Sequence, residues 1–138
     1  KYEKYIRAHL PTLNYAPIVF VSALTGQRVT GIFKTIDKVF MSRFTQLTEE
    51  DTKSFISQAI SKHKPSRGTG VQHPEIVSFT QVRLNPPKFA LLIKQARKDS
   101  LSPSYIKFLA NRLREQFDFT GTPIIMVVRG GNKKKHVT

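Results

Sequence analysis

Two runs of β-favouring residues joined by a short turn constrain the fold of this chain more than any other feature. The runs cover residues 76–84 and 88–95, and Asn85-Pro86-Pro87 separates them. Val, Ile and Phe suit pleated strands, whereas proline disrupts the ladder of a central strand and suits a turn. The sequence therefore predicts an antiparallel hairpin whose two prolines are confined to the turn.

A helix is predicted on the upstream side of this hairpin. Thr48 is placed to cap it, and Asp51 follows three residues later in a near capping-box arrangement. Apolar residues at helical spacing follow, and Pro65 marks the end of the pattern.

A second helix is predicted downstream, where Ser102 caps and Pro103 occupies the first turn. Its inward face holds Ile106, Leu109, Leu113 and Phe117. A final strand is expected over residues 123–129. The order α-β-β-α-β predicts a two-layer α+β sandwich with its helices on one face of a three-stranded sheet.

The first third of the chain has a different pattern. A short helix over residues 1–10 ends at Pro11, and the continuous apolar run 17–21 predicts a strand buried on both faces of a largely parallel sheet. A loop and a helix over residues 29–43 follow. This is the last β-α segment of an α/β domain, and we expect its upstream partners in a longer protein.

Three regions are therefore expected: residues 1–44 as the end of an α/β domain, residues 45–131 as the sandwich, and residues 132–138 as a basic tail. No internal repeat is found.

The charge of the chain indicates an anionic partner. Lys and Arg total 23 against 9 Asp and Glu, for a formal net charge of +14. Nucleic acid, an anionic membrane surface and an acidic protein all fit this charge, and so does a plain solvated surface. No apolar run is long enough to span a membrane. We expect nucleic acid as the partner and a cytoplasmic location.

Three groups of cations are candidate RNA contacts, and for each the alternative is a solvent-exposed surface without a binding role. The first brackets the loop 66–70, the second lies on the outer face of the last helix, and the third covers the last strand and the tail. In this order they are Lys62, Lys64 and Arg67; Lys107, Arg112 and Arg114; and Arg129, Lys133, Lys134 and Lys135.

Other kinds of site lack support in the residues. The chain has 4 His and no Cys, and no His pair stands at metal-ligand spacing, so no metal site is expected. No G-x-S-x-G nucleophile elbow occurs. Phe79, Phe89 and Tyr105 are aromatics that either stack RNA bases or, more commonly, fill a core.

The chain resembles the carboxy-terminal region of the Der (EngA) family of bacterial GTPases. Four stretches carry the resemblance, in order: Ala16–Val29; Thr80-Gln81 with Pro86-Pro87-Lys88-Phe89; Tyr105–Leu109 with Asn111–Arg114; and Phe119–Ile124 with Arg129.

The resemblance implies a KH-like RNA-binding domain attached to two GTPase domains, in a ribosome-associated protein that assembles the large ribosomal subunit on its RNA. It also implies that Ser22, Ala23 and Leu24 touch a guanine base through backbone groups. The parent would bind GTP or GDP with magnesium. An alternative role is a regulatory module that docks on the upstream GTPase domains and reports their nucleotide state. Contact with a GTPase domain is accordingly a further alternative for Lys107, Arg112 and Arg114.

The sequence departs from this pattern in two ways. It has no G-x-x-x-x-G-K-[ST] phosphate loop and no Asn-Lys-x-Asp segment, so we expect neither a cofactor nor GTP turnover in this chain alone. The Gly-x-x-Gly signature of KH domains is also absent, so the usual clamp on four nucleotides is not expected.

Overall fold

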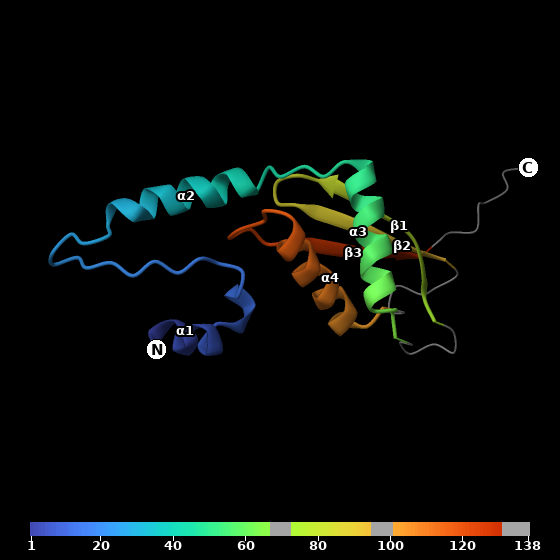
Figure 1. Ribbon diagram of the computed structural model, residues 1–138, viewed down its shortest axis with the longest axis horizontal. Coiled ribbons are helices and arrows are strands. Elements are labelled where there is room, and N and C mark those ends of the chain that lie inside the picture. Colours follow the sequence, from blue (N-terminus) through green and yellow to red (C-terminus); the bar gives the residue numbers. More distant parts are fainter. Residues whose placement is uncertain (67–72, 95–100, 131–138) are drawn as a thin grey trace, which may run out of the picture.

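The computed structural model describes residues 1–66, 73–94 and 101–130 (Figure 1). The elements are, in chain order, α1 (Tyr2–His9), the short 3-10 helix η1 (Pro11–Leu13), α2 (Thr30–Ser42), α3 (Glu49–Lys62), β1 (Glu75–Arg83), β2 (Lys88–Lys94), α4 (Pro103–Gln116) and β3 (Ile125–Gly130). Predicted loop residues within 67–72 and the tail within 131–138 lie outside the described residues. The α-β-β-α-β order from α3 onward is confirmed.

The three strands form one sheet in the order β1-β2-β3. β1 and β2 pair antiparallel, as the hairpin predicts, and the parallel pairing of β2 with β3 is made possible by the crossover through α4. Helices α3 and α4 lie on the same face of the sheet (Figure 1). This is the two-layer α+β arrangement expected from the sequence.

Both predicted helix caps are confirmed. The Thr48 hydroxyl accepts a hydrogen bond from the Asp51 N–H at 3.1 Å, while the Asp51 carboxylate accepts one from the Thr48 N–H at 2.8 Å. At α4, the Ser102 hydroxyl accepts from the Tyr105 N–H at 3.2 Å. These bonds satisfy backbone donors that a helix start otherwise leaves without partners.

The core lies between the two helices and the inner face of the sheet. Phe55 of α3 contacts Phe79 of β1 with ring centroids 5.3 Å apart, and Phe79 stacks on Phe89 of β2 at 5.1 Å. Phe89 meets Phe119 edge-on at 5.9 Å. Phe79, Phe89 and Tyr105 are at most 2% exposed, so the core interpretation of these aromatics is confirmed and none is free to stack a base.

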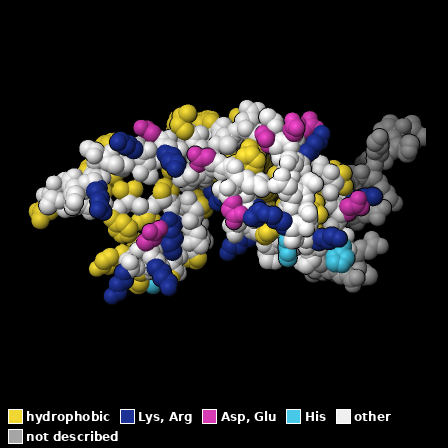
Figure 2. Space-filling view, in the orientation of Figure 1, with side chains coloured by type: hydrophobic (Ala, Val, Ile, Leu, Met, Phe, Trp, Pro, Cys, Tyr) yellow, Lys and Arg dark blue, Asp and Glu magenta, His cyan; other side chains and the backbone are white. Residues whose placement is uncertain are grey.

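The predicted strand 17–21 is wrong. Residues 17–21 run without regular secondary structure, and Val19, Phe20 and Val21 are exposed. A strand needs hydrogen-bonded neighbours, and the described residues supply none for this run. Figure 2 shows the result: hydrophobic side chains gather on the part of the surface formed by α1, α2 and the segment between them. None of the helices in the described ranges is both long and apolar enough to cross a membrane.

Candidate nucleic-acid interface

The first predicted cation group lies at the carboxyl end of α3. Lys62 occupies the last turn and Lys64 follows the His63 cap, and both side chains are exposed. Neither has a carboxylate partner among the described residues. Lysines here also complement the partial negative charge of the helix end, so Lys62 has a structural role in addition to any RNA contact. Arg67 lies outside the described residues.

The second predicted group on α4 does not form one face. Lys107 is exposed and lines a groove of 600 Å³ between η1 and α4, together with Asn111, which lies one turn further along the helix. Arg112 instead pairs with Glu115 at 2.5 Å and is half-buried. Of these three cations, Lys107 is therefore the one that is exposed and has no carboxylate partner in the described parts of the chain.

Arg114 is the clearest correction to the predicted outer face. Its guanidinium donates to the carbonyl oxygens of Phe119 and Thr122, both at 2.8 Å, and lies 4.5 Å from the centre of the Tyr15 ring. Burial lowers the pKa of Arg114 from its ordinary value, and the nearby Tyr15 raises it in part. The side chain is therefore engaged in holding the loop after α4 against Tyr15, which no spacing on α4 alone could reveal.

This loop fastens the sandwich to the first 44 residues at Gly121. The Gly121 N–H donates to the Tyr15 carbonyl at 3.2 Å, and the buried Ser42 hydroxyl at the end of α2 donates to the Thr120 carbonyl at 2.5 Å. Gly121 has a φ of +68°, and a Cβ built on it would clash with Cγ2 of Val39. Glycine is therefore required both for the backbone conformation and for the close approach of α2. We call residues 119–122 with Tyr15, Val39 and Ser42 the joint.

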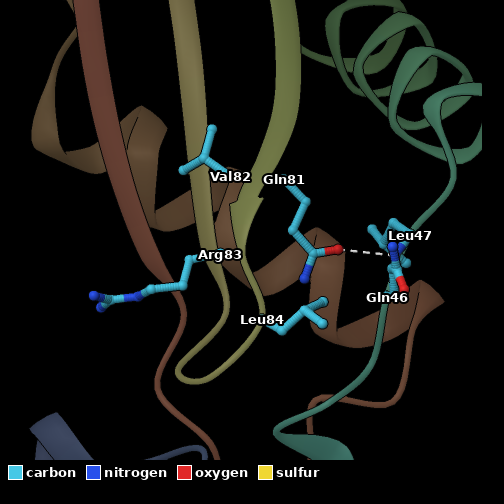
Figure 3. A pocket seen from close by; sticks show the side chains of 6 residues that line it. All are labelled: Gln46, Leu47, Gln81, Val82, Arg83 and Leu84. Atoms are coloured by element: carbon cyan, nitrogen blue, oxygen red, sulfur yellow. Dashed lines mark hydrogen bonds between the residues drawn. The ribbon is translucent and has the colours of Figure 1, made fainter.

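A second connection links the segment after α2 to the hairpin. The side-chain amide of Gln81 accepts from the Leu47 N–H at 2.8 Å (Figure 3). It also donates to the Thr45 carbonyl at 3.0 Å. The Gln81 side chain thus satisfies one backbone donor and one backbone acceptor of the segment between α2 and α3. Figure 3 also shows Arg83 pointing away from Gln81, toward the opposite face of the sheet.

Arg129 of the third predicted group lies on that opposite face, and two cations missed by the sequence reasoning accompany it. Arg83 is the cross-strand partner of Lys88 where β1 and β2 meet at the hairpin, and Arg129 lies beside Leu92 on β3. The alternation of side chains within each strand could have indicated that these cations face away from the core. It does not reveal the register between strands, which is what brings the three cations onto one face. Lys133, Lys134 and Lys135 lie outside the described residues.

The loop of Ser22, Ala23 and Leu24 is tightly closed. The Ser22 N–H donates to the Gln27 carbonyl at 3.1 Å, and Gly26 and Arg28 adopt φ values of +70° and +63°. Leu24 is 96% exposed. The backbone N–H groups of Ala23 and Leu24 donate to no described residue, so they are available to an outside acceptor.

Within the described ranges, no group of three or more His, Cys, Asp or Glu side chains is arranged to hold a metal ion.

Comparison with known proteins agrees with this fold. Residues 46–129 match the family model described as "KH-domain-like of EngA bacterial GTPase enzymes, C-terminal". The chain is 39% identical over 129 residues to GTPase Der of Natranaerobius thermophilus, an alignment covering 94% of this chain and 29% of that protein. It is 33% identical over 138 residues to GTPase Der of Geobacter metallireducens, covering 98% of this chain and 30% of the relative. The chain thus spans less than a third of the relatives' length, and it belongs to the family of carboxy-terminal KH-like domains of the EngA (Der) bacterial GTPases.

Proposed function

We propose that this chain binds ribosomal RNA through its KH-like domain, as part of a cytoplasmic, ribosome-associated GTPase acting in large ribosomal subunit assembly. The family membership supports the parent activity, since the relatives are named GTPase Der. In this proposal the parent binds GTP or GDP with magnesium upstream of this chain. Ser22, Ala23 and Leu24 close one side of the guanine site, consistent with the free backbone donors of that loop.

The observation that carries the RNA proposal is an excess of unneutralised cations. The net charge is +14, and ion pairs within the described residues engage only Arg7, Lys53, Lys94 and Arg112. Exposed lysines such as Lys62, Lys64 and Lys107 keep their charge available for phosphates. In the KH-like domain the Phe79, Phe89 and Tyr105 rings are buried, so contact of this domain with the RNA backbone is favoured over base stacking.

Fluorescence anisotropy with labelled ribosomal RNA fragments tests this proposal. We expect a Kd of about 1–100 µM at physiological salt that rises steeply with KCl, because each neutralised phosphate releases counterions. Replacing Lys62, Lys64 and Arg67 together by Gln should weaken binding to all fragments alike. A Kd that hardly changes between 50 and 200 mM KCl would contradict the proposal.

A second candidate function is a regulatory contact with the GTPase domains, and the joint is the observation that favours it. Tyr15 and Val39 contact the loop 119–122 within the same chain, and Ser22 lies only seven residues after Tyr15. A displacement of the loop of Ser22, Ala23 and Leu24 would therefore be transmitted over a few residues to Tyr15, and from the joint to α4.

Binding of this chain to the isolated GTPase domains of the parent, loaded with GDP or with a GTP analogue, tests the second candidate. It requires an affinity that differs between the two nucleotide states, and equal affinity would reject it. GTP turnover by this chain alone should be undetectable, and measurable turnover would contradict the placing of the catalytic motifs upstream.

A further inference from the structure

The sheet has one face without a covering helix among the described residues. Helices α3 and α4 both lie on the other face (Figure 1), and Phe79, Phe89, Leu91, Ile93, Met126 and Val128 point into that core. Side chains alternate along a strand, so the intervening residues lie on the opposite side. We call this side the open face, formed by Ser78, Thr80, Arg83, Lys88, Ala90, Leu92, Ile125, Val127 and Arg129.

The register gathers positive charge on the open face. Arg83 and Lys88 are direct cross-strand partners, and Lys88 is also paired with Ile125 on β3. Arg129 lies four residues beyond Ile125 on the same strand, about 13 Å away at roughly 3.3 Å per residue. Arg83 and Arg129 are exposed and Lys88 is half-buried. None of these three cations has a carboxylate partner among the described residues.

Carboxylate charge on this side is already balanced. The three strands are described in full, and Glu75 is their one acidic residue. It pairs with Lys94 at 3.3 Å at the end of the sheet. The open face therefore carries a net positive charge, which repels cationic surfaces and attracts anionic ones.

The side chains between the cations indicate which anion fits. Ser78, Thr80, Ala90 and Val127 are small or β-branched, and no aromatic ring lies on the open face. A face without aromatics offers no platform for the unstacked bases of single-stranded RNA. A broad surface with cations near its two ends instead suits the phosphates of a base-paired helix, which proteins recognise by shape and backbone contact.

We infer that the open face binds the phosphate backbone of helical RNA, with Arg83, Lys88 and Arg129 as the contacts. This inference rests on the proposed RNA binding and gives it a surface distinct from the Lys62 and Lys64 end of α3. Recognition through phosphates alone makes the binding independent of base sequence.

The test compares two variants of the full chain that lose the same net charge. R83Q/K88Q/R129Q removes the open-face cations, and K4Q/K34Q/K53Q removes three exposed lysines from α1, α2 and α3. Anisotropy titrations use a labelled RNA hairpin of about 14 base pairs and a single-stranded RNA of equal length, each from 25 to 200 mM KCl. Urea unfolding followed by circular dichroism checks that each variant is folded. The double variant R83Q/R129Q changes only exposed side chains, so it keeps the test valid if loss of Lys88 perturbs the sheet.

We expect the open-face variant to lower the magnitude of the slope of log K against log [KCl] on the hairpin by about 2–3, since each phosphate contact contributes roughly 0.9. The control variant should change it by less than about 1. Equal effects of the two variants, or a loss confined to the single strand, would overturn the inference. So would an unchanged hairpin slope accompanied by loss of docking to the GTPase domains. If the unmodified chain binds neither RNA, the proposed function itself fails. If it binds both and only K62Q/K64Q weakens binding, the open-face inference alone fails.

Discussion

Replacing Gly121 with alanine should separate the sandwich from the first 44 residues. The left-handed backbone at φ +68° costs a residue with a Cβ about 1–2 kcal/mol. The new Cβ would also clash with Cγ2 of Val39 and lie 3.0 Å from Cδ of Pro17. Forcing an extra carbon into such a contact costs about 1–3 kcal/mol. We therefore expect G121A to destabilise the chain by about 2–5 kcal/mol in total.

Two comparisons isolate the steric part of this loss. Gly26 has nearly the same φ, +70°, but nothing lies within 4 Å of its Cβ position, so G26A pays at most the backbone cost. V39A removes both clashing methyl groups, so G121A/V39A should recover much of the steric cost in a double-mutant cycle.

The free energy of unfolding is measured by urea titration with circular dichroism, and amide NMR shifts of Tyr15 and Val39 report contact at the joint. If G121A costs no more than G26A, or if V39A gives no relief, the joint is not packed as described.

Three further substitutions test single contacts. R114K keeps the charge but cannot bridge the two carbonyls, so it should cost about 1–3 kcal/mol in urea unfolding while leaving RNA affinity unchanged; weaker RNA binding would instead make Arg114 a phosphate contact. T48A should cost about 1 kcal/mol at pH 7 through loss of the cap. Hydrogen bonds from the Thr48 side chain, and then from its backbone, lower the pKa of Asp51 below 3.8 in the folded chain. The stability that ionised Asp51 contributes is therefore present above pH 3.8 and is lost as the pH falls through the pKa of Asp51 in the folded chain. Y105F leaves the His63 carbonyl without its donor at 2.9 Å and should cost about 1 kcal/mol in thermal unfolding. Burial raises the pKa of Tyr105 above 10.0, so the hydroxyl's contribution is complete below pH 10 and should decline above it, whereas a constant difference between wild type and Y105F would contradict this.

Local chemistry determined the elements of the sandwich from sequence alone. At a helix start, a Thr or Ser side chain accepts a hydrogen bond from a free N–H group two or three residues later. Both helix starts, at Thr48 and Ser102, were therefore predictable from local sequence. The turn at Asn85-Pro86-Pro87 likewise predicted the antiparallel hairpin. These signals act over a few residues and need no information about the rest of the fold.

The predictions that failed depended on contacts between distant parts of the chain. Residues 17–21 have the composition of a buried strand, but a strand forms only when neighbours pair with it, and the described chain has none to offer. Arg114 has the sequence position of a surface cation, yet Tyr15, from the other end of the chain, and the carbonyls beyond α4 enclose it. A contact across such a separation leaves no periodic signal.

The positive charge of the chain was evident from composition, and its arrangement was not. The register of β1, β2 and β3 decides that Arg83, Lys88 and Arg129 share one face, because shifting one strand by a single residue would turn its side chains to the other side. Sequence thus determined the elements and the sign of the charge. Only tertiary structure decided which cations stand together and which, like Arg114, hold the molecule together.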